Sequence, residues 1–358
     1  MKTRVLNLPI HVFDFFSGCG GTCKGFQDAG MKIIFAIDSD SGSQETFRNN
    51  FPCTNLIPQK IENVDVQDIQ SIVASSQPHP ILFSVSAPCQ PYTNQKTIKP
   101  LEDSRIGLLD EFLKFVQRYL PDYIFLENVP GLQKFNIGEG PFARFIATLD
   151  IYGYEYEHNI IRAQDYGVPQ KRKRLILIAS RLGKIKLPAK THGPNTPNPQ
   201  YSRVVEWIGD LPPIEAGSSH LIMLNHVAAS LSPTNRERIM NTPEGGGRKD
   251  WPEKLMLKCH SNGYEGHTDV YGRMSWDRPA SCLTTRCTSI SNGRFGHPDQ
   301  NRAISVREAA CLQTFPRDFL FYGGITSMAR QIGNAVPPIL AQHMGKAFID
   351  HFLVHSKK

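Results

Sequence analysis

The sequence predicts an α/β protein with a mostly parallel sheet and flanking helices, and three observations lead to this prediction. Short apolar runs alternate along the chain with stretches of helical periodicity, as in βαβ units. A glycine-rich turn, residues 17–21, links the first apolar run to the first helical stretch. Polar residues follow the ends of several runs, and in an open parallel sheet those ends meet at the edge where ligands bind.

The composition is that of a globular protein, with 358 residues, 40% of them hydrophobic and 20% charged. No window approaches the 18 or more apolar residues of a membrane span. The basic start is followed by polar Asn7 and His11, which is unlike a secretory signal, so we expect a cytoplasmic protein. A net charge of +7 suits an anionic partner without identifying one.

The eight cysteines are scattered along the chain and do not resemble a disulfide framework. Neither Cys19 with Cys23 nor Cys282 with Cys287 forms a Cys-x-x-Cys pair. We therefore expect no metal site.

The first strand is expected over residues 10–16, with a helix near 24–29 after the glycine turn. Residues 32–37 predict a second strand that ends at Asp38, where a carboxylate can bind ribose hydroxyls. The turn lacks the third glycine of the dinucleotide fingerprint, so it suits S-adenosylmethionine better than NAD. An ordinary strand-to-helix turn remains the alternative.

A lone cysteine, Cys89, follows the buried strand expected over residues 81–85, which Pro88 terminates. By itself such a cysteine is more often a small buried hydrophobe than a reactive group. The strand over 123–126 delivers Glu127 at its end, so Gly18, Asp38, Cys89 and Glu127 are expected at one sheet edge. That convergence favours a reactive site over four unrelated residues.

Helical periodicity predicts a helix over 108–120, and two further strands are expected over 154–161 and 174–179. Beyond Arg181 proline and glycine become frequent in polar sequence, which indicates a second, looser domain. A final helix is expected over 339–352. We expect residues 1–185 and 327–358 to form one domain and residues 186–326 the other.

The chain resembles the bacterial DNA (cytosine-5)-methyltransferases over nearly its full length. Six blocks of sequence carry the resemblance in the family's order: residues 14–21, 88–90, 127–129, 170–174, 278–284 and 331–337. This chain departs from the family pattern at Ser86-Ala87, Thr93 and Cys282. The acidic residue that contacts the adenine amino group in the family is not fixed by the sequence, and Glu62, Asp65 and Asp68 all remain open.

The resemblance implies a Rossmann-like S-adenosylmethionine-dependent methyltransferase domain plus a smaller, irregular target-recognition domain. It also implies methylation of carbon 5 of a cytosine in a short site of double-stranded DNA, with base flipping. In that reaction Cys89 attacks carbon 6 and Glu127 acts at N3. The other implied roles are cytosine O2 binding by Arg174, support of a loop or of a phosphate by Arg172, and anchoring of the Glu127 turn by Asn128.

The resemblance further assigns the cofactor S-adenosylmethionine and its product S-adenosylhomocysteine. Phe16 would pack on adenine, Asp38 would bind ribose, and the glycines would surround the methionine moiety. The full set of implied cofactor residues is Phe16, Ser17, Gly18, Gly20, Gly21, Asp38, Pro88, Asn334 and Val336.

The implied partners are double-stranded DNA and a restriction endonuclease that recognises the same site, with the protein acting as a monomer away from membranes. Candidates for DNA contact are Gln90, Arg248, Lys249, Arg273, Arg286 and Arg294. Three other functions stay open: methylation of transfer RNA, DNA binding without activity, and a dehydrogenase.

Overall fold

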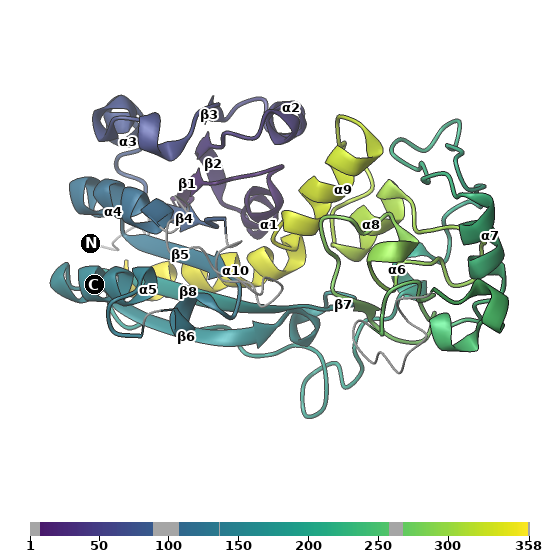
Figure 1. Ribbon diagram of the computed structural model, residues 1–358. Helices are drawn as coiled ribbons and strands as arrows, with labels where there is room; N and C mark the ends of the chain where they lie inside the picture. Colours follow the sequence, from purple (N-terminus) through teal and green to yellow (C-terminus); the bar gives the residue numbers. More distant parts are fainter. Residues whose placement is uncertain (1–7, 89–106, 136, 258–267, 357–358) are drawn as a thin grey trace. The chain divides into compact units, whose positions relative to one another are not determined.

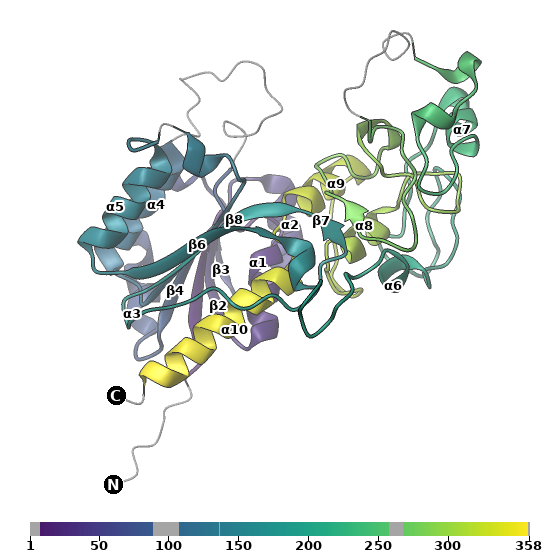
Figure 2. The same cartoon turned by 90° about the horizontal axis from the view of Figure 1, so that it is seen from below.

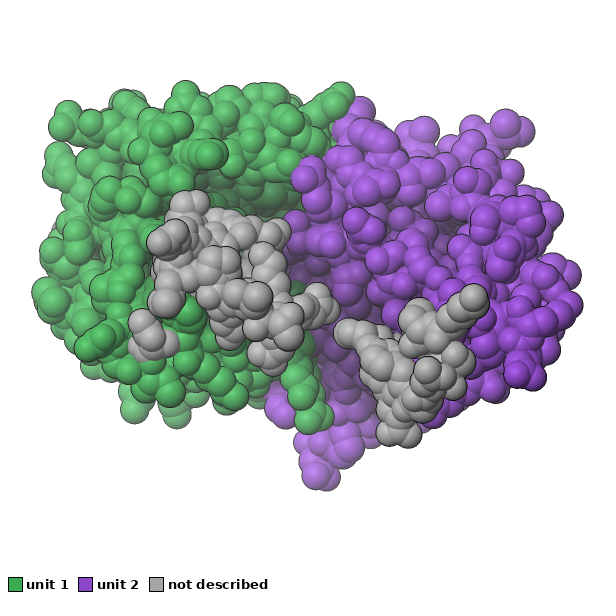
Figure 3. Space-filling model, in the orientation of Figure 1, with its two compact units in different colours: residues 1–162, 173–189, 338–358 green, residues 163–172, 190–337 purple. Residues whose placement is uncertain are grey.

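The computed structural model describes residues 8–88, 107–135, 137–257 and 268–356. The chain divides into two compact units, which Figure 3 distinguishes by colour. The first unit comprises Met1–Arg162, Lys173–Ala189 and Pro338–Lys358. The second comprises Ala163–Arg172 and Lys190–Pro337.

The first unit is built on a seven-stranded sheet in the order β3-β2-β1-β4-β5-β8-β6 (Figure 1). The strands are β1 (His11–Phe15), β2 (Lys32–Ile37), β3 (Asn55–Ile57), β4 (Ile81–Val85), β5 (Tyr123–Asn128), β6 (Glu155–Arg162) and β8 (Lys173–Ser180). The first five in this order pair in parallel, whereas β8 runs antiparallel to both β5 and β6. The mostly parallel sheet is thus confirmed, and the short edge strand β3 is an element that the sequence did not reveal.

Helices cover both faces of this sheet (Figure 2). On one face α1 (Gly21–Ala29) packs against α10 (Pro338–His355), and on the other lie α4 (Leu108–Tyr119) and α5 (Pro141–Ile151). The remaining helical segments of this unit are α2 (Ser41–Asn50), α3 (Gln70–Ser75), η1 (Ile61–Asn63), η2 (Val66–Ile69) and η5 (Leu132–Lys134). Within the described residues, no helix combines the length and the apolar character that crossing a membrane requires.

The period-2 alternation of the strands explains why both faces are covered. Phe15 and Phe83 face α4, where both contact Phe112. On the opposite face Phe125 of β5 meets Phe26 of α1 edge-on, with ring centroids 5.3 Å apart. Because each face buries aromatic side chains, the layered arrangement removes a large apolar area from water.

The second unit has little regular sheet. Its strands are the two-residue pair β7 (Gln170–Lys171) and β9 (Ala280–Ser281). Its helical segments are η6 (Ala163–Tyr166), α6 (Val205–Ile208), α7 (Pro233–Met240), η7 (Arg248–Asp250), η8 (Glu253–Leu255), η10 (Ile290–Asn292), α8 (Val306–Leu312) and α9 (Ile325–Asn334). This unit also contains residues 163–172 and 327–337, so the compact units divide the chain at different residues from the domains expected from the sequence.

Candidate active site

The carboxyl ends of β2, β1, β4 and β5 lie next to one another along the sheet. Asp38 follows β2, Phe16 follows β1, Ser86 follows β4, and Glu127 lies near the end of β5. The topology therefore brings these residues to one edge of the first unit, the edge at which the sequence predicted Gly18, Asp38, Cys89 and Glu127. Cys89 and Gln90 lie outside the described residues.

The glycine turn is held by Asp38. The Gly18 amide donates to Oδ2 of Asp38 at 2.7 Å, and the Asp40 amide donates to Oδ1 at 2.8 Å. Gly18 and Gly20 adopt positive φ angles of 53° and 95°, which favour glycine. A Cβ on Gly20 would come within 2.3 Å of the Phe51 ring, so a larger residue would displace that ring.

Two hydroxyls near this turn have no hydrogen-bond partner among the described residues. They are the buried Oγ atoms of Ser17, after β1, and of Ser86, after β4. The position of a Cβ on Gly18 is open, with no heavy atom within 4 Å. Because a buried hydroxyl without a partner is costly, these groups fit a site that a polar ligand completes.

Glu127 and Arg174 form an ion pair at the same edge. Arg174 Nε lies 2.8 Å from Glu127 Oε1, and the side chains are 16% and 9% exposed. The contact has the distance of an ion pair but not the direction of a hydrogen bond, so Oε1 has no aligned donor among the described residues. The pair therefore presents a carboxylate oxygen and a guanidinium side by side with unused hydrogen-bonding capacity.

Asn128 fixes the turn after Glu127. Its Oδ1 accepts from the Val129 amide at 2.9 Å, and its Nδ2 donates to the Ala87 carbonyl at 3.1 Å. The end of β5 is thus tied to the segment that runs from β4 through the exposed Pro88.

The residues of the 170–174 motif are divided between the two compact units. Arg174 belongs to the first unit, whereas Gln170 and Arg172 belong to the second and are fully buried there. Arg172 donates to the carbonyls of Leu283, Gly333 and Ala335, each at 3.1 Å. Of the two roles left open for Arg172, these contacts favour loop support over a phosphate contact.

The carbonyls held by Arg172 flank Asn334, which is exposed, and precede Val336, which is buried. Gln313 adds a hydrogen bond to the Ala335 carbonyl. A Cβ on Gly333 would lie 2.2 Å from the Thr284 carbonyl oxygen, so glycine is required there. The second unit therefore holds the segment of these two cofactor candidates in one conformation.

The DNA-contact candidates divide by exposure. Arg273 is 3% exposed and donates to four backbone carbonyls and to Asn301. We correct the expectation for Arg273, because a guanidinium engaged in this way has no surface to offer a base or phosphate. Arg248 is buried as well, and Arg294 is half-buried against loop carbonyls and Asp269, whereas Lys249 and Arg286 are exposed.

Other acidic and metal-binding candidates are less informative. Asp65 and Asp68 cap η2 reciprocally, and Glu62 lies in η1, so the adenine-contacting acid stays open among the three. Across the described ranges no three His, Cys, Asp or Glu side chains come together in a manner that could hold a metal ion.

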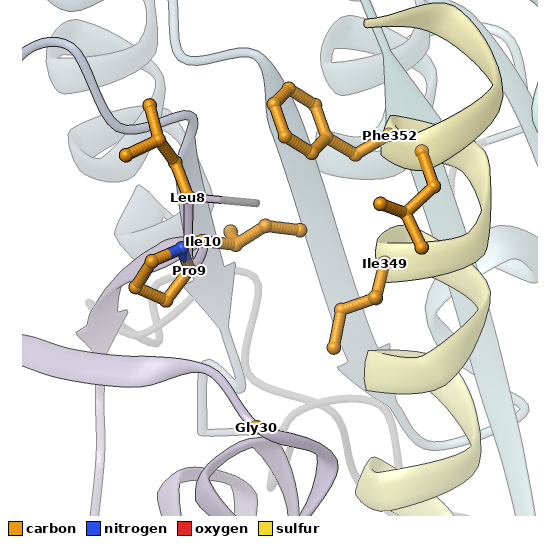
Figure 4. Close-up of a pocket in the computed structure, with 7 residues that line it drawn as sticks. Leu8, Pro9, Ile10, Gly30, Ile349 and Phe352 are labelled. Atoms are coloured by element: carbon orange, nitrogen blue, oxygen red, sulfur yellow. The ribbon is translucent and has the colours of Figure 1, made fainter. Parts of the chain in front are cut away.

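A small apolar cavity of about 130 Å³ lies elsewhere in the first unit (Figure 4). Leu8, Pro9 and Ile10, just before β1, line it together with Ile349 and Phe352 of α10. It therefore adjoins the amino end of β1, opposite the edge that carries Glu127, and the described residues that line it have no ionisable or nucleophilic side chain.

Near the edge that carries Glu127 lies a buried ionisable residue that the sequence reasoning did not single out. Asp14 lies within the buried strand β1 and contacts Ser84 of β4 and Cys23 of α1. The available signal was an acidic residue inside an otherwise apolar strand.

Comparisons with known proteins agree with this architecture. The C-5 cytosine-specific DNA methylase family matches residues 10–350. The Type II methylase M.HgiDII of Herpetosiphon aurantiacus is 39% identical over 347 residues, covering 96% of this chain and 95% of that protein. The Type II methyltransferase M1.HphI of Haemophilus parahaemolyticus is 31% identical, covering 97% of this chain and 89% of that protein.

Two solved structures share the fold. A prophage-encoded protein of E. coli, described as a DNA modification methyltransferase, has a TM-score of 0.66 at 22% identity and covers 95% of this chain and 99% of its own. The S. pombe Dnmt2 methyltransferase has a TM-score of 0.62 at 17% identity, with 96% and 98% covered.

The fold is therefore that of the S-adenosylmethionine-dependent methyltransferases. Within that class, the chain belongs to the C-5 cytosine-specific DNA methylase family, and it is a DNA (cytosine-5)-methyltransferase. Membership of this family implies S-adenosylmethionine as the methyl donor.

Proposed function

We propose that this chain methylates carbon 5 of a cytosine within a specific short sequence of double-stranded DNA, by base flipping and covalent catalysis through Cys89. The pair formed by Glu127 and Arg174 carries the proposal. A cytosine ring presents N3 and O2 side by side, and a carboxyl group with an adjacent guanidinium can hold both atoms.

Carbon 5 of cytosine is a poor nucleophile until a thiolate adds to carbon 6. Cys89 supplies that thiolate in the proposed reaction. A free thiol titrates near pH 8.5, so the site must favour the thiolate or remove the proton during attack. The bond from Asn128 to the Ala87 carbonyl supports this role, since it ties the strand end that leads to Cys89 to the turn that carries Glu127.

Negative charge moves into the ring as the thiolate adds, and Glu127 shares a proton with N3 at that moment. Such general acid help typically contributes about 10²–10⁴-fold. Arg174 binds O2 and keeps Glu127 in place. After methyl transfer, loss of the proton on carbon 5 and departure of Cys89 restore the aromatic ring.

The cofactor supplies the methyl group as an electrophilic sulfonium and leaves as S-adenosylhomocysteine. Phe16 and Asp38 would bind adenine and ribose, and the turn from Ser17 to Gly21 would surround the methionine part. The unpartnered hydroxyls of Ser17 and Ser86 support a polar ligand here. Pro88, Asn334 and Val336 are further proposed cofactor residues, and the hydrogen bonds from Arg172 to the carbonyls of Gly333 and Ala335 hold the segment of the last two.

Double-stranded DNA is the proposed substrate, and residues 186–326 are proposed to recognise the target. The target carbon is inaccessible inside a duplex, so the cytosine must rotate out of the helix. Among the basic candidates, Lys249 and Arg286 are exposed and suited to phosphate contacts. We propose that the protein works as a monomer in the bacterial cytoplasm beside a restriction endonuclease with the same target, because the relatives are named Type II methylases.

Bisulfite sequencing tests the reaction and the target together. Purified protein and S-adenosylmethionine are incubated with plasmid DNA, and with transfer RNA in a parallel reaction. We expect 5-methylcytosine at one short DNA sequence and none in the RNA. Methylation of the RNA alone would overturn the proposed substrate.

The role of Cys89 has its own test. Cys89→Ala should abolish methyl transfer while S-adenosylmethionine binding, measured by calorimetry, stays within about twofold, because the thiol is not a proposed cofactor ligand. Wild type should form a covalent adduct with 5-fluorocytosine-containing DNA that resists denaturing electrophoresis. Cys53→Ala, at an exposed cysteine, is the matched control. Substantial turnover by Cys89→Ala would refute the covalent mechanism.

A further inference from the structure

Asp14 is a buried ionisable residue that the proposed mechanism does not use. All five residues of β1 are buried, and Asp14 is 1% exposed. Its Oδ1 accepts a hydrogen bond from Ser84 Oγ at 2.7 Å, and its Oδ2 accepts one from Cys23 Sγ at 3.0 Å. The carboxylate thus joins three elements, β1, β4 and α1, just below the edge that carries the glycine turn.

Within the described ranges of the chain, no cationic side chain is bonded to this carboxylate. Both donors are neutral, and burial holds the pKa of Cys23 well above its usual range and raises the pKa of Cys19 to about 12. The charged side chain that acts on Asp14 is Asp38, which has the same sign. Burial above all, with a contribution from Asp38, raises the pKa of Asp14 to about 6, although the hydrogen bonds from Cys23 and Ser84 oppose that rise.

The raised pKa means that the charge of Asp14 opposes folding. Between the ordinary value of 3.8 and about 6, the folded protein holds a proton that the unfolded chain has lost. Stability therefore falls as pH rises through that window, and at neutral pH the charged carboxylate is less favourable than a neutral side chain of the same shape. A charge kept at such a position points to a ligand of opposite sign.

The position of Asp14 relative to the proposed cofactor residues fits such a ligand. Asp14 precedes Phe16 by two residues, a distance of about 7 Å along a strand. Cys23, its hydrogen-bond partner, lies in the first turn of α1, directly after the glycine turn. S-adenosylmethionine carries a sulfonium and an ammonium against one carboxylate. When the methyl group leaves, the sulfur keeps the electron pair of the broken bond, so the product S-adenosylhomocysteine has lost the sulfonium charge.

We propose that Asp14 is a specificity-determining residue of the cofactor site, whose buried carboxylate favours S-adenosylmethionine, with its extra sulfonium charge, over the net-neutral product. This inference rests on the proposed cofactor site. The discrimination comes from the field of the carboxylate and needs no direct contact. It also helps turnover, because product formation removes the charge that Asp14 attracts.

The test compares wild type with Asp14→Asn, which keeps the shape of the side chain and removes its charge. Calorimetry gives the Kd of S-adenosylmethionine and of S-adenosylhomocysteine between pH 5.5 and 7.0. We expect the ratio of the two constants to shift by about five- to tenfold toward the product in the variant, the size expected for a screened charge pair about 10 Å apart. In wild type the ratio of the two constants should also shift toward the product as pH falls through about 6, because Asp14 is then protonated. In the variant the ratio should not change with pH in this range.

Two further readouts separate this role from a structural one. Binding of S-adenosylmethionine to wild type near pH 6 should release protons, seen as a dependence of the binding enthalpy on buffer ionisation heat, and Asp14→Asn should release fewer. The variant should also unfold at the same or a higher temperature than wild type at pH 7. Asp122→Asn, which makes the same change at a carboxylate just before β5, at the other end of the sheet, is the matched control and should preserve the ratio.

If Asp14→Asn weakens the binding of both ligands by the same factor, the inference is overturned, because a purely structural role predicts that result. If the variant does not fold, the wild-type ratio decides, and a ratio that is constant from pH 7.0 to 5.5 overturns it. Failure of the proposed cofactor site looks different, since wild type would then bind neither ligand.

Discussion

The two units of this protein differ in the charged side chains that they bury beside their apolar ones. The first unit buries aromatic and aliphatic side chains on both faces of its sheet, in a large apolar cluster that includes Phe13, Phe83 and Leu177. The second also buries apolar side chains, such as Phe315, Phe319 and Phe321, but among its described residues it additionally buries arginines, including Arg172 and Arg273.

The reason for this difference lies in the backbone. A sheet pairs its own carbonyls in ladders, whereas irregular loops leave carbonyls that must find other donors. A guanidinium has five N–H donors in a fixed plane and can satisfy several carbonyls at once. Arg172, Arg273 and Arg307 all do this in the second unit.

This comparison changes how the net charge is interpreted. Some basic residues of the second unit hold loops together and are not available to DNA, so a count of arginines overstates the DNA-binding surface. In the first unit, by contrast, Glu127 at the carboxyl edge of the sheet keeps a carboxylate oxygen without an aligned hydrogen-bond donor among the described residues. Three experiments test that contrast.

The largest effect is expected at the edge of the first unit. Glu127→Gln should lower kcat by about 10²–10⁴-fold, because the amide cannot share a proton with N3. Glu155→Gln, at an exposed position in β6, is the matched control. Steady-state methylation assays measure the effect, and a kcat within tenfold of wild type would argue against the assigned role.

A buried arginine of the second unit should affect stability instead. Arg302 donates to both carboxylate oxygens of Glu308 at 2.7 Å, and both side chains are 1% exposed. Although burial alone would raise it, hydrogen bonds from Arg302 hold the pKa of Glu308 below its usual range. Arg302→Met leaves that charge unpaired and should cost about 3–5 kcal/mol of unfolding free energy.

Tryptophan fluorescence can follow that loss in urea, since all three tryptophans, Trp207, Trp251 and Trp276, lie in the second unit. The control is Arg144→Met, which breaks an exposed pair with Asp110 in the first unit and should cost less than about 1 kcal/mol. Equal costs for the two variants would remove the distinction drawn between the units.

The smallest effect is expected at the exposed basic residues. Lys249→Ala and Arg286→Ala should each weaken duplex binding a few-fold and reduce the slope of log K against log salt by about 0.9, as loss of one phosphate contact does. Lys254→Ala, whose lysine is paired with Glu237 at 2.6 Å, is the control for charge alone. Titrations at several salt concentrations measure the slope, and equal slopes for all variants would place the DNA elsewhere.

The sequence by itself determined the strands, the edge and most of the first unit. Each of these follows from local information: the period of apolar residues, a glycine turn, and polar residues placed shortly after β1, β2 and β4 and at the end of β5. The expected helix over 108–120 is confirmed as α4 for the same reason. The short strand β3 was not predicted, because its three partly exposed residues show no clear alternation of apolar and polar side chains.

Only the tertiary structure decided which charged residues face each other. Asp14 hydrogen-bonds to Cys23 and Ser84, which lie 9 and 70 positions away from it in the sequence. Arg172 reaches carbonyls up to 163 positions away, and Arg273 is buried among loops distant in sequence. The residue type alone does not show whether an arginine binds a phosphate or hydrogen-bonds to loop carbonyls. Its role depends on desolvation and on partners that the fold brings together, and neither is a property of its neighbours in the chain.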